Sequence, residues 1–352
     1  MSVDFQYTPH ISTLAFASGS APNATAELKT RPEDFLVDEI LGFEPSGEGE
    51  HLYLHVKARD YNTEYLLEHI ARNLGVAKNS VVYSGQKDRY AVTTQWFSVH
   101  LPGNADIDVS VLENENVTIL AAKRNLKKLR RGAHKGNKFT IRLKNIAGNQ
   151  QDITAAIEDI QRRGFPNYFG PQRFGRDENN IATALASVAV GRSPKKRFQR
   201  SIVFSSLRSM LFNLSLSQRI EQGSWRQQLD GDVFALSGTE SFFSPDTSTG
   251  EAEQEILERL SSGDIAIAGV LFGDGDIPQS KKALEVLAPI LETHQNIVAF
   301  LIKQRVAVAV RPLSVLPKDF SFEWGTNDEL ELSFTLPKGA FATSLLREFV
   351  VC

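Results

Sequence analysis

Cysteine is almost absent from the 352-residue sequence, since Cys352 at the last position is the only one. An intramolecular disulfide is therefore impossible, and a cysteine-rich zinc site is excluded. Long apolar runs are also missing, so no segment spans a bilayer, and the first residues lack the basic start and apolar block of a secretory signal. These absences predict a cytoplasmic protein without a membrane-spanning segment.

Motifs of several common enzyme classes are missing as well. No Walker loop or dinucleotide-binding glycine fingerprint follows a strand-like run, and there is no Gly-x-Ser-x-Gly elbow of a serine hydrolase. His51 and His55 are four residues apart, but in a strand-like run this spacing is roughly 13 Å, too far for both to bind one metal ion. We therefore expect no metal site, and the remaining candidates for chemistry are a carboxylate, lysines, arginines and aromatic rings.

The order of strand-like and helix-like patterns predicts the fold class. Strand-like runs occupy residues 35–40, 51–56, 80–83, 94–99, 117–120 and 138–143, and helices are expected at 62–74 and 152–163. The pattern is mostly helical over 180–304, and strands return at 305–310 and 330–335 before a last helix at 342–349. Strands, a helical block and strands again indicate an α+β domain interrupted by an insertion.

The most informative stretch is Ser84–Gln95, with the sequence SGQKDRYAVTTQ. A short apolar run that ends at Tyr83 is expected to be a buried strand, and it leads to Lys87 and Asp88 just after Gly85. Charged side chains at a strand-to-loop junction are typical of places where a ligand is bound or transformed. From the residues alone, Asp88 is either a catalytic carboxylate or an ordinary turn carboxylate.

Positive charge is concentrated in one part of a chain whose formal net charge is −3. No acidic residue occurs between Glu115 and Asp152. The basic residues of this interval are Lys123, Arg124, Lys127, Lys128, Arg130, Arg131, Lys135, Lys138, Arg142 and Lys144. Such a run is either a solvated face or a binding surface for a polyphosphate. Its density favours RNA or DNA as the partner, and we expect binding that weakens steeply with added salt.

Three further motifs combine glycine with aromatic and polar residues. In GAHKGNKF, residues 132–139, Asn137 and Phe139 either belong to an ordinary hairpin turn or hydrogen-bond to a base and stack on it. In NYFGPQRFGR, residues 167–176, Arg173 lies among three rings, which suits either a core-anchored loop or a clamp for bases and phosphates. Phe341 lies where a loop turns into the last helix, a position that can present a ring to a ligand.

Five strings together resemble one family. RPEDFLVDE, GQKDRYAVTTQ, GNKFTIRL, NYFGPQRFG and LPKGAFATSLLRE occur in this order between Lys29 and Phe349, and they are similar to motifs of the tRNA pseudouridine synthase D (TruD) family. The resemblance implies a catalytic domain with a mixed, mainly antiparallel sheet flanked by helices, interrupted by a largely helical insertion domain. We place the catalytic domain at residues 1–165 plus 305–352 and the insertion at 166–304, whose acidic part matches no motif.

The resemblance also implies an activity, the isomerisation of uridine to pseudouridine at uridine 13 of tRNA. In this reaction the N1–C1′ bond breaks, the base turns, and C5 bonds to C1′. No electrons or phosphates are gained or lost, so no cofactor is expected, and the partner is tRNA bound by a monomer. A carboxylate either attacks C1′ or removes the C2′ proton, and the sequence leaves both routes open.

The same resemblance assigns roles to individual residues. It places the catalytic carboxylate on Asp88 and substrate binding on Phe35, Asn137, Phe139 and Phe341. Supporting roles are expected for Lys29, Lys87, Arg173 and Arg347, and a cation among them is expected to keep Asp88 ionised. Moving a base out of its stack costs a few kcal/mol, and stacking on a ring offsets roughly 1–3 kcal/mol per base. Without the resemblance, rings in these positions are more often core residues.

Two other functions fit the same residues. A non-catalytic tRNA-binding or RNA-folding protein would use the basic surface without needing Asp88. A nuclease or phosphotransferase would need a metal ion. Within the insertion, we expect the basic residues from Arg192 to Arg200 to contact tRNA. The acidic part from Asp230 to Glu292 is expected to face solvent or to repel the wrong surface.

Overall fold

The computed structural model describes residues 13–103, 107–245 and 250–352. Apart from the residues outside these ranges, the chain packs into two compact units. The first, called the sheet unit, combines Asn23–Ile153, Pro317–Gly339 and Val350–Cys352. The second, called the helical unit, combines residues 13–22, Thr154–Leu316 and Ala340–Phe349.

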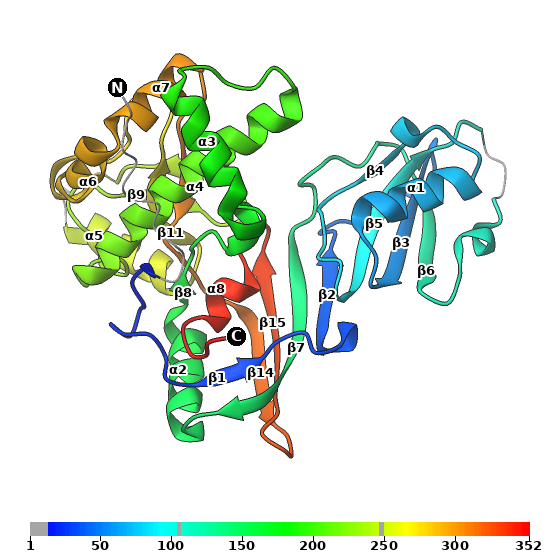
Figure 1. Cartoon of the computed structure of the whole chain (residues 1–352), viewed down its shortest axis with the longest axis horizontal. Helices are drawn as coiled ribbons and strands as arrows, with labels where there is room; N and C mark the ends of the chain where they lie inside the picture. Colours follow the sequence, from blue (N-terminus) through cyan, green and yellow to red (C-terminus); the bar gives the residue numbers. More distant parts are fainter. Residues whose placement is uncertain (1–12, 104–106, 246–249) are drawn as a thin grey trace. The chain divides into compact units, whose positions relative to one another are not determined.

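The sheet unit is built on a nine-stranded sheet (Figure 1). Its strands are β1 (Thr25–Glu27), β2 (Phe35–Ile40), β3 (His51–Arg59), β4 (Val81–Tyr83), β5 (Val92–His100), β6 (Val117–Asn125), β7 (Gly136–Ala147), β14 (Lys318–Trp324) and β15 (Leu330–Pro337). The main order is β14-β15-β7-β2-β5-β3-β6, while β1 pairs with β7 and β4 pairs with β5. Only β2 and β5 pair in parallel among the described strands of this sheet, so the predicted mixed, mainly antiparallel sheet is confirmed.

Helix α1 (Thr63–Asn73) covers part of this sheet. The side chain of Asn62 accepts a hydrogen bond from the backbone N–H of Glu64 and satisfies one of the donors that the first turn leaves unpaired. The helix ends before Gly75, which adopts a left-handed backbone with φ of 65°. Its apolar stripe shares a core with β3, β4 and β5, and the members of this core include Leu66, Leu67, Ile70, Leu54, Val81 and Phe97.

A row of aromatic rings lies where β2, β7 and β15 pair. Phe139 on β7 lies opposite Phe334 on β15. The ring centroids of Phe35 and Phe139 are 6.1 Å apart, and those of Phe139 and Phe334 are 5.5 Å apart. Because side chains alternate along a strand, Glu39 shares the face of Phe35, and Asn137 shares the face of Phe139. The pairing of β2 with β7 therefore brings the RPEDFLVDE and GNKFTIRL motifs together.

The helical unit holds most of the helices (Figure 1). They are α2 (Gln150–Arg163), α3 (Asn179–Ala189), α4 (Arg197–Glu221), α5 (Gly250–Ser261), α6 (Lys281–Thr293), α7 (Gln295–Lys303) and α8 (Ala342–Leu346). A four-stranded antiparallel sheet has the order β10 (Phe242–Phe243), β9 (Val233–Leu236), β11 (Ile265–Leu271) and β12 (Ala309–Pro312). A second small sheet pairs β8 (Phe165–Pro166) with β13 (Ser314–Val315). In the core, Leu207, Leu211 and Phe212 of α4 are fully buried.

The largely helical insertion is confirmed, with the four-stranded sheet as an addition that the pattern did not predict. The strand expected at 305–310 instead begins at Ala309 and pairs with β11. The first two residues of the expected strand instead terminate α7. Arg305 adopts a left-handed backbone with φ of 56°, and the N–H of Val306 donates to the carbonyl of Leu301. The compact units divide the chain at 153/154 and 316/317, whereas the predicted domain boundaries lie at 165/166 and 304/305.

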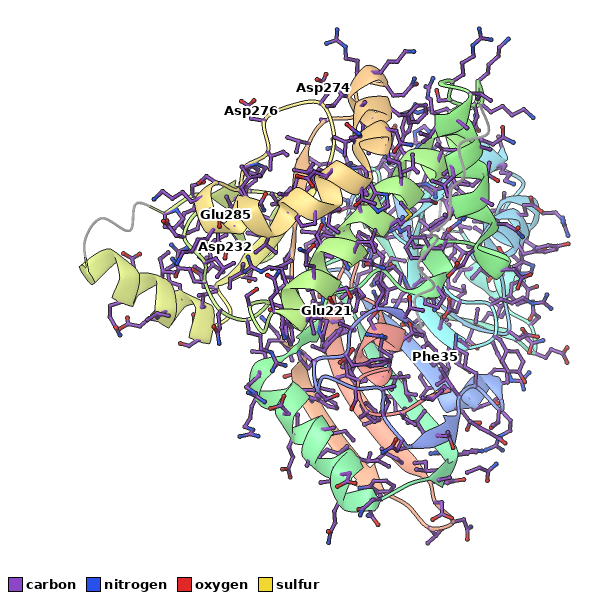
Figure 2. All side chains as sticks on the ribbon, turned by 60° about the vertical axis from the view of Figure 1, so that its left-hand side comes forward. Phe35, Glu221, Asp232, Asp274, Asp276 and Glu285 are labelled. Carbon is purple, nitrogen blue, oxygen red and sulfur yellow. The ribbon has the colours of Figure 1, made fainter. Side chains whose placement is uncertain are left out.

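The acidic part of the predicted insertion lies in the helical unit, where Figure 2 labels Asp232, Asp274, Asp276 and Glu285. Asp232 does not face solvent as expected. Its buried carboxylate accepts hydrogen bonds from both terminal nitrogens of Arg219, at 3.0 and 2.9 Å. At Asp232, the acidic stretch therefore supplies a buried partner for Arg219 inside this unit. Within residues 13–103, 107–245 and 250–352, no helix combines the length and apolar composition needed to cross a membrane.

Candidate active site

The segment that follows β4 is held by the turn that contains His134. The backbone N–H of Gly132 donates to the carbonyl of Ser84, and the N–H of His134 donates to Ser84 Oγ, both at 2.8 Å. A Cβ atom at Gly85 would lie 2.9 Å from Cε1 of His134, so glycine allows the ring to approach the loop. The GQKD and GAHKGNKF motifs are thus interlocked, and the position of Asp88 depends on both.

Lys87 pairs with Glu39 rather than with Asp88. Its ammonium group forms an ion pair with Glu39 Oε2, and the two side chains are 4% and 0% exposed. The other oxygen of Glu39 accepts a hydrogen bond from the backbone N–H of Trp96 at 3.0 Å. The backbone N–H of Lys87 donates to Thr63 Oγ1 at 3.0 Å. Lys87 therefore anchors the loop to β2, β5 and α1 instead of supplying the cation expected beside Asp88.

Lys29 is the cation beside Asp88. Its Nζ lies 2.6 Å from Asp88 Oδ2 and 4.0 Å from the centroid of the Phe35 ring. The side chain of Asp88 is 39% exposed, and that of Lys29 is 21% exposed. Within the part of the chain that the structure describes, Asp88 Oδ1 has no hydrogen-bond partner. One carboxylate oxygen is therefore held by a cation, and the other remains available.

The RPED turn explains how Lys29 reaches this position. Lys29 itself adopts a left-handed backbone with φ of 59°. The buried carboxylate of Asp34 accepts hydrogen bonds from the Thr30 hydroxyl and from the backbone N–H of Arg31, and it lies 3.3 Å from Lys144 Nζ. Burial would raise the pKa of Asp34, but the hydrogen bonds from Thr30 and Lys144 outweigh it, and its pKa lies below the usual value. The turn is therefore fixed by a charged carboxylate just before β2.

Asn137, Phe35 and Phe139 belong to the same face of the sheet but differ in their surroundings. Phe35 and Phe139 are 2% and 8% exposed, so in this structure they are core rings whose faces are mostly covered. Asn137 is only partly buried, yet its side-chain oxygen Oδ1 is buried and has no hydrogen-bond partner among the described residues. An unpaired buried acceptor of this kind is uncommon and indicates a missing donor.

The basic run divides into paired and unpaired residues. Lys123, Arg142 and Lys144 form ion pairs with Glu44, Glu331 and Asp34. Five others are exposed and form no ion pair with any described residue: Lys127, Lys128, Arg130, Lys135 and Lys138. The exposed Lys338 joins them, because its Nζ donates to the carbonyl of Gly132 at 3.3 Å. This exposed basic surface is continuous with the turn that holds the Asp88 loop.

Phe341 and Arg173 lie in the helical unit. Phe341 is the partly buried residue before α8, and its ring centroid is 6.2 Å from that of Phe169. The guanidinium carbon of Arg173 is 5.2 Å from the Phe169 centroid. The NYFGPQRFG and LPKGAFATSLLRE motifs are therefore in contact, as Gly170 also shows, since a Cβ there would lie 2.9 Å from Thr343 Oγ1.

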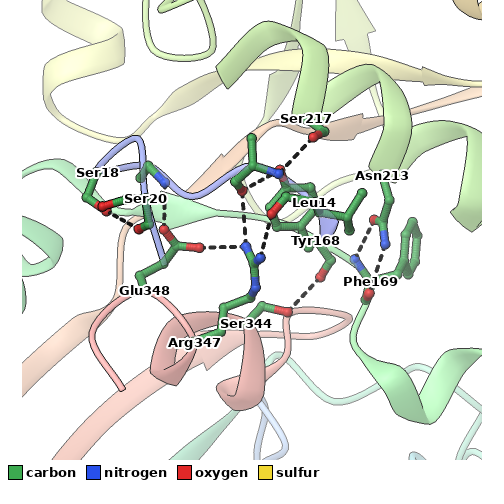
Figure 3. Close-up of polar contacts among 12 residues, drawn as sticks. Leu14, Ser18, Ser20, Tyr168, Phe169, Asn213, Ser217, Ser344, Arg347 and Glu348 are labelled. Atoms are coloured by element: carbon green, nitrogen blue, oxygen red, sulfur yellow. Dashed lines mark hydrogen bonds and ion pairs between the residues drawn. The ribbon is translucent and has the colours of Figure 1, made fainter. Parts of the chain in front are cut away.

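Arg347 holds the N-terminal segment of the helical unit (Figure 3). Its guanidinium group donates to the carbonyls of Leu14 and Ala15, at 2.8 and 3.2 Å, and to Glu348 Oε1 at 2.9 Å. Glu348 Oε2 accepts a hydrogen bond from the N–H of Ala17 at 2.7 Å. These contacts give Arg347 a structural task, and none of them supports the expected role beside a reacting base.

Comparison with known proteins decides the family. The family model of tRNA pseudouridine synthase D (TruD) matches residues 14–191 and 194–349. The tRNA pseudouridine synthase D of Aeromonas salmonicida is 43% identical over 330 residues, which cover 94% of this chain and 92% of that protein. The enzyme of the same name from Pseudoalteromonas atlantica is 40% identical over 335 residues, 94% of each chain. The chain belongs to the tRNA pseudouridine synthase D family.

A solved structure supports the fold of this family member. The crystal structure of the putative tRNA pseudouridine synthase D from Methanosarcina mazei aligns with a TM-score of 0.69 and covers 95% of both chains, at 22% sequence identity. The predicted α+β fold is therefore confirmed. The predicted enzyme class, a tRNA pseudouridine synthase and thus an isomerase, is confirmed by the family. The match also extends through the acidic part of the helical unit, where no motif was found in the sequence.

Two residues of these sites were not predicted from the sequence. Glu39 lies within RPEDFLVDE, and the alternation of Phe35, Val37 and Glu39 places a carboxylate on the apolar face of β2, a pattern that indicates a buried cationic partner. Arg311 contacts the Phe169 ring, with its guanidinium carbon 3.9 Å from the centroid. Nothing in the sequence around Arg311 separates it from other strand arginines.

Proposed function

We propose that this chain converts uridine 13 of tRNA to pseudouridine with Asp88 as the catalytic carboxylate. The observation that carries the proposal is the state of Asp88, which is partly exposed, paired through Oδ2 with Lys29, and without a partner on Oδ1 among the described residues. A carboxylate with one oxygen held and one oxygen available suits either attack on C1′ or removal of the C2′ proton. The ammonium group of Lys29 fixes the carboxylate and balances its charge.

We assign recognition of the uracil base to the face of the sheet that carries Phe35, Asn137 and Phe139. The unpaired Oδ1 of Asn137 is an acceptor, and the N3–H of uracil is a donor that is free once the base has left its pair. Phe35 and Phe139 support this face from the core, and we propose that the base contacts their edges. For Phe341, which belongs to the helical unit, substrate binding is retained as a separate proposal from the family resemblance. Such contacts offset part of the few kcal/mol needed to unstack the base.

Binding of the tRNA backbone is assigned to the two exposed basic regions. In the sheet unit these are the exposed Lys127, Lys128, Arg130, Lys135 and Lys138, next to the turn that holds the Asp88 loop. In the helical unit, Arg192, Lys195 and Lys196 are exposed in the turn between α3 and α4, and Arg197 and Arg200 are exposed at the start of α4. We retain as proposals the division into a catalytic domain (1–165 plus 305–352) and an insertion (166–304), the absence of a cofactor, a monomeric state and a cytoplasmic location.

The decisive experiment replaces Asp88 by asparagine, which keeps the shape of the side chain. We expect Asp88→Asn to lower the rate of pseudouridine formation by at least about a hundredfold, because the carboxylate takes part in bond breaking. Binding of unmodified tRNA is expected to change little. Asp60→Asn serves as the matched control, since Asp60 is a carboxylate of similar partial exposure that pairs with Arg89 in the same unit.

Full activity of Asp88→Asn would overturn the assignment of the catalytic carboxylate. Modified positions in the wild-type reaction are mapped at single-nucleotide resolution, and conversion at a position other than uridine 13 would overturn that part of the proposal. Tight tRNA binding by a wild-type protein that forms no pseudouridine would favour the non-catalytic alternative.

A further inference from the structure

The first turn of α4 lies outside the core of the helical unit. All residues from Lys195 to Ser201 are exposed, although a helix that packs on a core normally buries one stripe of side chains. Close packing begins only at Val203, which is 1% exposed. The helix therefore starts at an edge of its unit (Figure 1), and the core does not dictate which side chains its first turn carries.

The connection that leads from α3 to this turn is anchored. Gly191 adopts a left-handed backbone with φ of 66°, and the N–H of Arg192 donates to the carbonyl of Ser187 at 3.1 Å, which closes the end of α3. The hydroxyl of Ser193 then donates to Oε1 of Gln304, the residue after α7, at 2.7 Å. The exposed turn thus follows an ordered segment, which reduces the entropy lost when a ligand binds to it.

An aromatic ring is exposed on this turn. Phe198 is 72% exposed, the largest exposed fraction of any large apolar side chain among the described residues. Phenylalanine is also a weaker helix former than alanine or glutamine, so helix propensity does not explain its presence. A single exposed apolar residue is normal on a protein surface, and the ring alone does not define a site. The charges around it do.

All charges near the ring in the sequence are positive, because no acidic residue occurs between Glu178 and Glu221. The exposed cations on both sides of the ring are Arg192, Lys195, Lys196, Arg197 and Arg200. None of the five forms an ion pair with any described residue. Arg197 and Arg200 lie in the first turn of α4, where positive side chains oppose the helix dipole and destabilise the helix. The charge therefore does not serve the fold and indicates an anionic partner.

We propose that the α3–α4 tip, residues 190–200, binds RNA by stacking Phe198 on an unpaired base while the flanking cations contact the neighbouring phosphates. Exposed rings among cations are the combination that binds single-stranded nucleic acid, and folded RNA offers unpaired bases in its loops. The tip contains no carboxylate, so it holds the RNA without taking part in the reaction. A second copy of the same tip would bring five more cations against it, which opposes self-association. The choice of tRNA as the RNA rests on the proposed function.

The test replaces Phe198 and measures binding of unmodified tRNA over a series of salt concentrations. Alanine is the better helix former, so Phe198→Ala is expected to fold as the wild type does. We expect it to bind tRNA about tenfold more weakly, because one stacking contact is lost. The slope of log affinity against log salt should not change, since no phosphate contact is removed. Phe198→Trp keeps a stacking surface and should retain the affinity of the wild type.

A second probe and a matched control separate stacking from charge. A fully paired RNA duplex offers phosphates but no unpaired base, so its affinity should not respond to Phe198→Ala. Arg197→Gln should instead reduce the salt slope by roughly 0.7–0.9 for both RNAs, the value for one phosphate contact. Leu257→Ala is the matched control, because Leu257 is a 49% exposed apolar residue on α5 between the exposed Glu255 and Glu258. It should leave tRNA affinity unchanged.

Wild-type affinity of Phe198→Ala for tRNA would overturn the inference. An equal loss of affinity for tRNA and for the duplex would also overturn it, because the ring would then contact the backbone rather than an unpaired base. Dimerisation that Phe198→Ala abolishes in sedimentation, with tRNA affinity unchanged, would assign the ring to a second copy of the chain. Pseudouridine formation is assayed separately. A wild type that forms none but binds tRNA through Phe198 would refute the proposed function and leave this inference standing.

Discussion

Lys87 and Asp88 are neighbours in the chain but have different tasks in the structure. The ammonium group of Lys87 is buried against Glu39, whereas Asp88 remains partly exposed beside Lys29. A buried ion pair adds little net stability relative to apolar residues, but removal of one partner leaves an unpaired charge in the core. The pair therefore acts as a constraint that holds the loop, and Asp88 is carried by that loop.

The role of Lys87 is tested by Lys87→Met, which keeps most of the side-chain volume. We expect a loss of roughly 3 kcal/mol in the free energy of unfolding, measured with urea, because Glu39 is left buried without a cation. The activity of the folded variant is also expected to fall, since the loop that carries Asp88 loses its anchor. The double variant Glu39→Gln/Lys87→Met removes both charges and keeps an acceptor for the N–H of Trp96, so much of the stability should return. Equal stability of single and double variants would contradict this explanation.

For single residues, the sequence offered candidates for function but not their interaction partners. The junction of a short strand and a charged loop made Asp88 one of two alternatives, a catalytic or a turn carboxylate, and the family resemblance favoured the first and added Lys29. The partner of Lys87 was not accessible, because it depends on the pairing of β2 with β5 and on which face Glu39 occupies. Likewise, the burial of Phe35 and Phe139 follows from their position in the middle of the sheet, which no local pattern reveals.

The segment Leu14–Ala17 shows how an element without regular structure is held in place (Figure 3). Arg347 donates to two of its carbonyls, and the Ser217 hydroxyl accepts from the N–H of Ala15 at 2.8 Å. The guanidinium carbon of Arg347 also lies 3.9 Å from the centroid of the Phe16 ring. The segment is thus attached to the end of α8 and to α4 by charged and neutral hydrogen bonds together.

Replacement of Arg347 by methionine tests this attachment. We expect Arg347→Met to lower the free energy of unfolding by roughly 3 kcal/mol and to expose Leu14–Ala17 to limited proteolysis, because Glu348 loses its cation. Burial raises the pKa of Glu348, so the folded protein holds that proton more tightly than the unfolded chain and the loss is larger at pH 8 than at pH 5. Ser18→Ala, which removes an exposed hydrogen bond nearby, serves as the control with a change below about 0.5 kcal/mol. Loss of activity without loss of stability would instead favour a role for Arg347 in the reaction.

Elements with a clear period were predicted well, and those without one were not. The strand at 35–40 and the helix at 62–74 agree with β2 and α1 because alternation in the first and a capped apolar stripe in the second are local properties. β11 (Ile265–Leu271) was missed inside a segment taken as helical, since a short apolar run without clear alternation suits a buried strand or a buried helix equally. β14 is an exception: it was missed although Phe320, Phe322 and Trp324 alternate with polar residues and are its partly buried positions.

At the scale of the whole molecule, each compact unit has its own apolar core. The core of the helical unit includes Leu207 and Phe212, and the core beneath α1 in the sheet unit includes Leu54 and Phe97. Separate cores allow separate unfolding, so a single two-state transition is not assumed for this chain. Partly buried histidines with lowered pKa are distributed unequally between the units, with His51, His55 and His134 in the sheet unit and His294 in the helical unit.

This distribution predicts that the stability of the sheet unit depends more strongly on pH than that of the helical unit. Burial lowers the pKa of all four histidines. The cause is clearest at His55, whose ring stacks on Trp96 with 4.6 Å between the centroids and whose Nε2 is buried with no hydrogen-bond partner in the described parts of the chain. The negative charges of Asp38 and Glu39 raise the pKa of His55, but the lowering by burial is larger. A lowered pKa means that the folded protein binds fewer protons than the unfolded chain below about pH 6.5. The stability that these histidines contribute is therefore present above pH 6.5 and is lost as the pH falls toward 5.

Differential scanning calorimetry at pH 7.5 and pH 5.5 measures the effect. We expect the transition of the sheet unit, which holds three of the four histidines, to shift to lower temperature more than that of the helical unit. His55→Phe keeps the stacked ring and removes the titration, so it should reduce the shift of the sheet-unit transition and identify which transition belongs to that unit. His294→Asn should reduce only the shift of the other transition. If His55→Phe changed the pH dependence of neither transition, burial of an uncharged imidazole would not be the source of the acid sensitivity.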